Sequence, residues 1–92
     1  MIKVNKYLDG KVVSLGFELD GNRYTTGVFS PGEYSVPTEV EEHVTVTLGG
    51  FEIRISGKGW KSLKTGDKLV IPAGSNVDYK VGKPASYVCL FK

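Results

Sequence analysis

The chain has 92 residues, which is enough for one hydrophobic core, so we expect a single domain spanning residues 1–92. Its formal charge of +2 comes from scattered lysines with no basic run, which argues against a nucleic acid polymer as partner. The N-terminus lacks the apolar core of a signal peptide, and no apolar run approaches the roughly 18 residues of a membrane span, so we expect a cytoplasmic protein with no membrane partner.

Glycine and proline interrupt the sequence so often that no long window keeps a helical period. There are 12 Gly and 4 Pro, whereas apolar and polar residues alternate repeatedly. We therefore expect an all-β fold with no substantial helix. The single cysteine, Cys89, provides neither an internal disulfide nor the spacing of a metal site.

The first hairpin is predicted from an alternating strand over residues 11–19, a tight Asp-Gly-Asn turn at 20–22 and a returning strand over 23–29. Alternation places every second residue of the first strand on one face. The apolar residues that share this face are Val13, Leu15, Phe17 and Leu19.

Residues 30–42 are rich in turn formers and acids, so they are predicted to connect strands, with short extended pieces around Tyr34 and Val36. A second hairpin is predicted over residues 43–55, with its turn at the Gly-Gly pair 49–50. The residues predicted to point inward from this hairpin are Val44, Val46, Leu48, Phe51, Ile53 and Ile55.

Four more short strands follow at the regular spacing typical of a β-sandwich or a small barrel. They are predicted over residues 60–63, 68–72, 77–81 and 86–91.

The stretch from Gly66-Asp67 to the Ile-Pro-Ala-Gly run at 71–74 resembles the second motif of the cupin family, which is a jelly-roll β-barrel. In that motif a histidine three residues after the last glycine would bind a metal ion. This chain has Val77 at that position.

The first cupin motif would run through Glu42, which stands seven residues before Gly49, as the carboxylate ligand of the family does. The two histidines expected before it fall near Val36 and Thr38. A stable transition-metal site needs about three or four nitrogen, sulfur or carboxylate ligands. We therefore expect a cupin-like barrel with no metal ion.

A more specific resemblance covers nearly the whole chain. Four stretches, NKYLDGKVVSLGF, GVFSPGEYSVPTEVEEHVTV, IPAGSNVDYKV and PASYVCLF, are similar to the short cupins known as pyrimidine/purine nucleoside phosphorylases. That family is described as cleaving nucleosides with phosphate, without a metal, to give a free base and ribose 1-phosphate. The resemblance implies a pentosyltransferase of broad base specificity that needs no cofactor, with a nucleoside and inorganic phosphate as its partners.

Two positions depart from the pattern that the family leads us to expect. His43 stands where we expect an apolar residue, and Val36 stands where we expect an aromatic one. If either position lines the pocket, the substrate preference would differ.

Phosphorolysis needs a cation for the phosphate, groups that hold the ribose hydroxyls and some stabilisation of the departing base. The chain has two arginines. Arg23 follows the hairpin turn and would reach the mouth of the barrel, where a guanidinium grips phosphate with paired hydrogen bonds. The alternative is a solvated arginine at the start of a strand. Arg54 is predicted to lie on the outer face as a partner of Glu52 or Lys68.

Glu42 has the inward phase of Val44 and Val46, so we expect it to project into the barrel, where a carboxylate would bind ribose hydroxyls or a base edge. The alternative is a solvated turn glutamate beside Glu39 and Glu41. His43, the only histidine, has the opposite phase and is predicted to be a surface residue rather than an acid or base.

Small donors near the predicted turns supply further candidates. We expect Ser75 to assist Arg23 with phosphate, and Thr38 to contact substrate. Ser14 is a third small donor of this kind.

Aromatic side chains offer flat faces for a base and hydroxyls for orientation. The tyrosines expected to contact substrate are Tyr7, Tyr34 and Tyr87, with Tyr34 preferred. Cys89 shares the face of Tyr87 and is predicted to be a buried, apolar thiol. Trp60 is predicted to pack over a sheet or at a subunit contact.

A second function class stays open: the same barrel mouth would bind a nucleoside or a sugar without turnover. Phosphate-dependent release of free base separates the two. Exposed edge strands gain from being covered, so we also expect a homodimer.

Overall fold

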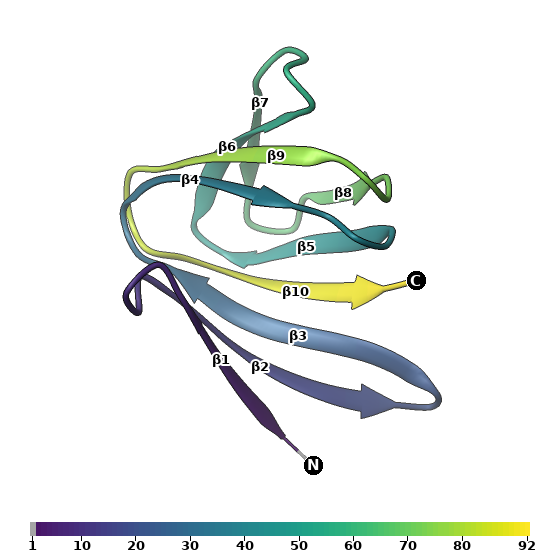
Figure 1. Ribbon diagram of the computed structural model, residues 1–92. Helices are drawn as coiled ribbons and strands as arrows, with labels where there is room; N and C mark the ends of the chain where they lie inside the picture. The colour runs from purple at the N-terminus through teal and green to yellow at the C-terminus, as the bar shows by residue number, and fades with distance from the viewer. Residues whose placement is uncertain (1) are drawn as a thin grey trace.

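The computed structural model describes residues 2–92, and all ten regular elements are β-strands, arranged in two layers (Figure 1). One sheet has six strands in the order β1-β2-β3-β10-β5-β8, and the other has four in the order β4-β9-β6-β7. The strands of the first sheet are β1 (Lys3–Tyr7), β2 (Val12–Leu19), β3 (Asn22–Phe29), β10 (Ala85–Phe91), β5 (Glu42–Leu48) and β8 (Lys68–Ile71). The strands of the second are β4 (Gly32–Pro37), β9 (Asn76–Val81), β6 (Gly50–Ile55) and β7 (Lys61–Lys64).

Every pair of neighbouring strands is antiparallel. The all-β prediction is confirmed. The two sheets pack face to face as a sandwich and do not join into the closed barrel that was expected. Between residues 2 and 92, no helix has the length and apolarity that crossing a membrane would take.

The first predicted hairpin is present as β2 and β3. Its turn uses Asp20 at φ 51° and Gly21 at φ 78°, which is the left-handed conformation that an Asp-Gly turn favours. The apolar face predicted for β2 is the outer face of the sheet, with Leu15 41% and Leu19 56% exposed. The inner face carries Val12 and Ser14, which are both buried.

The second predicted hairpin is present as β5 and β6, with Val44, Val46, Phe51 and Ile53 buried as expected. Leu48 was predicted to point inward and is 70% exposed instead. The pairing of β5 with β10 shifts register between Ser86 and Tyr87. An extra residue at such a bulge reverses the faces beyond it, so Leu48 turns outward.

Two strands were underestimated or missed in the sequence. Residues 32–37 form β4, which pairs with β9 over six positions, where only short extended pieces around Tyr34 and Val36 were expected within a connecting stretch. Residues 3–7 form β1. Both are edge strands, where proline is tolerated because one side of the backbone needs no partner.

The core fills the space between the sheets. Phe29 lies at its centre, with its ring centroid 5.2 Å from that of Phe51, 4.9 Å from Tyr79 and 4.9 Å from Tyr87. The other buried apolar residues are Val12, Tyr34, Val44, Val46, Ile53, Leu63, Ile71, Val77, Val81, Ala85 and Cys89. Phe29, Tyr79 and Tyr87 also line a space that remains between the layers.

Candidate active site

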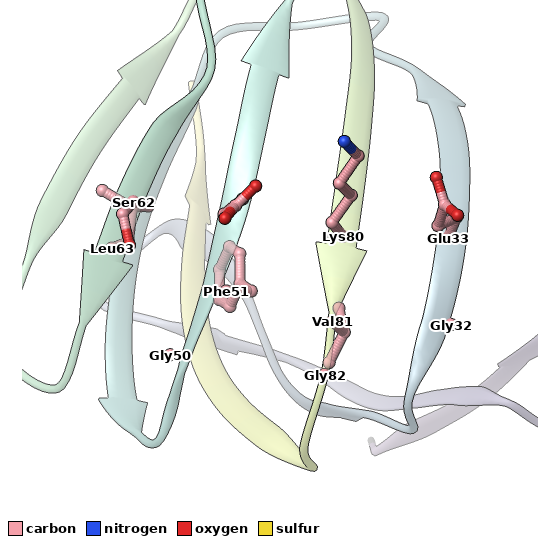
Figure 2. A pocket seen from close by; sticks show the side chains of 10 residues that line it. Gly32, Glu33, Gly50, Phe51, Ser62, Leu63, Lys80, Val81 and Gly82 are labelled. Atoms are coloured by element: carbon pink, nitrogen blue, oxygen red, sulfur yellow. The ribbon is translucent and has the colours of Figure 1, made fainter.

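Two hollows of similar size, formed by residues within the range 2–92, are candidates for a ligand site. The first, of about 600 Å³, lies on the outer face of the four-stranded sheet, where Figure 2 shows Glu33 and Lys80 on neighbouring strands. Cross-strand pairing places Glu33, Lys80 and Glu52 in one row. The Lys80 ammonium lies 4.3 Å from the centre of the Trp60 ring. Alternating charges on an exposed sheet face are ordinary surface pairs, and none of the predicted site residues lies here.

The second hollow, of about 700 Å³, lies between the two sheets and is the candidate active site. It brings together four of the predicted residues, which come from four different strands. They are Tyr7 of β1, Arg23 of β3, Glu42 of β5 and Tyr87 of β10. Ser14, Thr25, Tyr79, Cys89 and Phe91 also line it.

One end of this cavity carries opposite charges on either side of an aromatic ring. Strand β10 lies between β3 and β5, and Phe91 pairs with Arg23 on one side and with Glu42 on the other. The Arg23 guanidinium carbon lies 4.7 Å from the centre of the Phe91 ring. With strands spaced about 4.8 Å apart, the two charged residues start roughly 10 Å apart across the sheet. Phe91 lies between them in the sheet, and all three side chains line the cavity.

Glu42 is half-buried, and burial raises the pKa of its carboxyl above the usual 4.5. The Cys89 thiol, whose sulfur lies 3.6 Å from Glu42 Oε1, and the charge of Arg23 both oppose this rise. Desolvation is the largest effect because the carboxylate leaves water and gains only a weak sulfur donor. A polar ligand with hydroxyl groups would supply the missing hydrogen bonds.

Tyr87 crosses the cavity floor over a glycine of the neighbouring strand. Tyr87 pairs with Gly27 of β3, and Gly27 pairs with Ser14 of β2. A methyl group added to Gly27 would lie 2.7 Å from the Tyr87 hydroxyl oxygen and 2.9 Å from Ser14 Cβ. Gly27 therefore makes room for the Tyr87 phenol beside Ser14.

Tyr79, Tyr87 and Cys89, which also line the cavity, are held in their neutral forms. Burial raises the pKa of Tyr79 far above 10.0. Burial and the neighbouring Cys89 raise the pKa of Tyr87 to about 12, and burial beside Glu42 raises the pKa of Cys89 to about 12. A neutral thiol is a poor nucleophile, so the cavity offers hydroxyl and thiol groups as hydrogen-bonding partners.

Three predicted residues do not line the cavity. The Tyr34 hydroxyl donates to the carbonyl of Ser30 at 2.5 Å, so Tyr34 holds a turn inside the core. Thr38 is buried and donates to the Pro72 carbonyl at 2.9 Å. Ser75 donates from its hydroxyl to the same carbonyl at 2.7 Å. Thr38 and Ser75 tie two loops together, and their hydroxyls are already used.

Two other expectations concern residues away from the cavity. Arg54 points outward as predicted, although its partner is Asp78, with Nη2 2.9 Å from Oδ2, rather than Glu52 or Lys68. It also lies over Trp60, which packs on the sheet face as expected. His43 has the outward phase and lies 2.7 Å from Glu41.

The metal positions of the cupin motifs carry no metal ligands in this fold. Val36 and Val77 pair with each other across β4 and β9, and Thr38 holds the loop at Pro72. Over residues 2–92, no three His, Cys, Asp or Glu side chains gather in a way that could hold a metal ion.

Tyr79 and Leu8 also line the cavity and were not predicted as site residues. The alternation of β9 offered a signal for Tyr79, because it shares the inward phase of Val77 and Val81. Leu8 lies in the turn between β1 and β2, where neither alternation nor the turn pattern indicated a role.

Comparisons with known proteins identify relatives over almost the whole chain. The family model described as pyrimidine/purine nucleoside phosphorylase matches residues 2–91. A protein of that name from Sorangium cellulosum is 37% identical over 92 residues, covering 99% of each chain.

Solved structures share the fold. A protein of unknown function from Vibrio parahaemolyticus superposes with a TM-score of 0.96 at 31% identity, covering 100% of this chain and 99% of that one. An RmlC-like cupin from Shewanella frigidimarina superposes with a TM-score of 0.78 at 16% identity, covering 98% and 82% of the two chains. The cupin-like fold expected from the sequence is confirmed.

Proposed function

The chain belongs to the pyrimidine/purine nucleoside phosphorylase family, and from this we propose that it cleaves purine and pyrimidine nucleosides with inorganic phosphate, giving a free base and ribose 1-phosphate. The observation that carries the proposal is the cavity between the sheets, in which Arg23 and Glu42 flank Phe91. A cation and a carboxylate that line the same cavity suit a phosphate and a polyhydroxylated sugar.

In the proposed reaction Arg23 binds phosphate through paired hydrogen bonds, which hold the anion next to the sugar. A phosphate oxygen forms a bond to the C1 carbon of ribose while the bond from C1 to the base nitrogen breaks. The electron pair of that bond leaves with the base, which then takes up a proton. Arg23 therefore lowers the barrier by fixing the nucleophile in place.

Glu42, Tyr7 and Tyr87 are proposed to hold the nucleoside. The half-buried carboxylate of Glu42 accepts hydrogen bonds from ribose hydroxyls, which replaces the water that burial removes. Tyr7 and Tyr87 contribute aromatic faces and hydroxyls. Walls built from aromatic and apolar groups contact the faces of a base more than its edges. Such contacts accept both purines and pyrimidines.

Release of free base from inosine or uridine, measured with and without phosphate, tests this function. We expect release that requires phosphate and yields one ribose 1-phosphate per base. Binding of a nucleoside with no release at any phosphate concentration would support the alternative, a cupin that binds a nucleoside or a sugar without turnover.

We also propose a homodimer in which the outer face of the six-stranded sheet is covered. Val4, Leu15 and Val28 on β1, β2 and β3 are 58%, 41% and 50% exposed. Contiguous exposed apolar surface is unusual on a monomer, and a two-fold axis would cover it with its own copy. Sedimentation should give the mass of two chains for the wild type and for Glu52→Lys on the opposite sheet, and of one for Leu15→Lys. A cytoplasmic location stays a prediction, which cell fractionation would check.

A further inference from the structure

The Arg23 guanidinium lies over an aromatic ring that lines the cavity. Its carbon is 4.7 Å from the centre of the Phe91 ring, and a cation within about 6 Å of a ring is attracted to its face. Phe91 is the last residue of β10 and is partly buried against the core. Because β10 pairs with β3 on one side and with β5 on the other, the backbone that carries this ring is fixed on both sides.

Two carboxylates lie in the same row of the sheet as this arginine. Glu18 of β2 pairs with Arg23 on one side, and Glu42 of β5 pairs with Phe91 on the other. Residues that pair across antiparallel strands project from the same face, so both carboxylates share a face with the guanidinium. Within residues 2–92, neither carboxylate is among the groups that form an ion pair. The guanidinium therefore contacts the ring and is paired with neither neighbour.

The other arginine of the chain has a different arrangement. Arg54 lies over Trp60, with its guanidinium carbon 4.6 Å from the ring centre, and it also pairs with Asp78. Its Nε and Nη2 groups donate to Asp78 Oδ2 at 3.0 and 2.9 Å, so they are used within the protein. Arg23 has the ring contact without such a pair. Of the two arginines, the one that lines the cavity keeps its charge for a ligand.

A ring contact and an ion pair use different parts of a guanidinium. The ring attracts the positive charge, whereas an ion pair with a carboxylate also uses the N–H groups. An arginine held over a ring can still bind phosphate through paired hydrogen bonds. An arginine paired with a carboxylate must first break that pair.

The competing pair is within reach at this site. Burial raises the pKa of the Glu42 carboxyl, and the Cys89 thiol and the charge of Arg23 oppose this rise. The two charged groups therefore attract each other across the cavity. Their strands are separated by β10 alone, which is about 10 Å between backbones. An arginine and a glutamate side chain together are long enough to span this distance if nothing stands between them.

We propose that Phe91 is a positioning residue, whose ring holds the Arg23 guanidinium and keeps it from pairing with the Glu42 carboxylate, so that the guanidinium stays available to phosphate. This inference rests on the proposed nucleoside phosphorolysis, in which Arg23 binds phosphate. The ring also orders a long side chain before the anion arrives, which reduces the entropy lost on binding.

Phe91→Leu and Phe91→Tyr form a matched pair that tests the proposal. Leucine keeps apolar bulk against the core but has no ring face, whereas tyrosine keeps the ring. For Phe91→Leu we expect the dissociation constant for inorganic phosphate, measured by calorimetry, to rise about threefold to thirtyfold. The KM for phosphate should rise likewise, whereas the KM for inosine should stay within about twofold of wild type. Phe91→Tyr should bind phosphate as the wild type does.

Phe17→Leu is the control for the loss of an aromatic ring from the same sheet. Phe17 lies on the outer face of β2, with its ring centroid 5.8 Å from that of Tyr24. It is not among the residues that line the cavity. Its leucine variant should therefore bind phosphate with the affinity of the wild type.

A second substitution tests whether Glu42 is the competing partner. In Phe91→Leu the released guanidinium should pair with Glu42, so adding Glu42→Gln should raise phosphate affinity more in Phe91→Leu than in the wild type. Adding Glu18→Gln is the control and should change phosphate affinity equally in both backgrounds. The opposite pattern, with coupling to Glu18 and none to Glu42, would overturn the proposal.

The kinetic results also distinguish the role of Phe91 from the function itself. Unchanged phosphate affinity in Phe91→Leu, with phosphorolysis intact, would overturn the role of Phe91 and leave the proposed function standing. A higher KM for inosine with unchanged phosphate affinity would overturn it too, because Phe91 would then contact the nucleoside directly.

If the wild type shows no phosphorolysis, phosphate binding and nuclear magnetic resonance separate the two ideas. The Phe91 ring should shift the resonance of the Arg23 Nε–H group in the wild type and in Phe91→Tyr, and this shift should disappear in Phe91→Leu. That result, with weaker phosphate binding by Phe91→Leu, would support the positioning role even though the reaction is absent. The same Arg23 resonance in all three proteins, or no phosphate binding by the wild type, would overturn it.

Discussion

The Cys89 sulfur lies 3.6 Å from Oε1 of Glu42, across the pairing of β10 with β5 and inside the cavity. Thiols are weak donors, so this contact offsets little of the cost of burying the carboxylate. The surroundings of Glu42 therefore disfavour its charged form, which lowers the stability of the fold. Such an arrangement is expected of a residue that binds a ligand.

Glu42→Gln should stabilise the protein at neutral pH. The pKa of the folded-state carboxyl is raised above 4.5, so between the unfolded-state and folded-state pKa values the folded protein binds more protons. Stability then falls as pH rises through that window. The glutamine variant has no such proton to lose. Urea unfolding across this pH range should show a higher midpoint for Glu42→Gln at the upper end and a weaker dependence on pH.

The same substitution should lower phosphorolysis, because an amide accepts ribose hydroxyls less strongly than a carboxylate. Glu39→Gln and Glu41→Gln are the matched controls, since Glu41 is exposed and pairs with His43 and Glu39 is exposed at the rim of the cavity. Equal activity in all three variants would remove Glu42 from the site.

Arg23→Ala should weaken the dependence of the phosphorolysis rate on phosphate concentration. Losing a charge-assisted hydrogen bond costs about 1.5–3 kcal/mol, which lowers kcat/KM for phosphate by at least ten- to a hundredfold. Arg23→Lys should recover only part of this loss, because an ammonium cannot make the paired contact. Initial rates across phosphate concentrations provide the measurement.

Arg54→Ala is the control for Arg23, because Arg54 pairs with Asp78 on the outer face of the other sheet. Its initial rates across phosphate concentrations should match those of the wild type. A wild-type profile in Arg23→Ala as well would mean that the phosphate site lies elsewhere.

Gly27→Ala should displace the Tyr87 ring, because the new methyl group would lie 2.7 Å from the Tyr87 hydroxyl. Overpacking of this kind usually costs about 1–3 kcal/mol of stability. The nucleoside KM should rise along with the loss of stability. Gly16→Ala, also on the inner face, is the control, since its methyl group would meet its nearest atom at 3.6 Å. Similar unfolding midpoints and KM values for the two variants would contradict a role for Gly27 in placing Tyr87.

Removal of metal ions should leave phosphorolysis unchanged. Val36, Thr38 and Val77 occupy the positions of the cupin histidines and supply no strong metal ligand. Activity after dialysis against a chelator, with and without added zinc, iron or manganese, is the measurement. A loss on dialysis that one of these ions reverses would show that the reaction needs a metal.

Alternation along the strands was readable from the sequence because a strand that faces a core repeats every second residue. Val44, Val46, Phe51 and Ile53 are buried as this period requires. Leu48 continues the same pattern and is exposed, because the register shift opposite Ser86 and Tyr87 reverses its face. A bulge depends on the partner strand, so the period of one strand does not contain it.

The choice among candidate side chains depended on local contacts that no pattern reveals. Tyr34 was preferred as a substrate residue, yet its hydroxyl bonds the Ser30 carbonyl within the core. Tyr87 was predicted with less emphasis and lines the cavity. Both tyrosines are aromatic residues on strands, and only the neighbours that each ring meets decide which of them is left to contact a ligand.

The sequence by itself determined the family, the all-β class, the lack of histidines at the metal positions and the inward phase of Glu42, because each of these depends on residue types and spacings along one stretch of chain. Only the tertiary structure decided that Arg23 and Glu42 flank Phe91 and that Leu8 lines the same cavity. The physical reason is that β10, the last strand of the chain, inserts between β3 and β5. Pairing between segments so far apart is set by the packing of the whole sandwich, since hydrogen bonds of the backbone are much the same for any pair of strands.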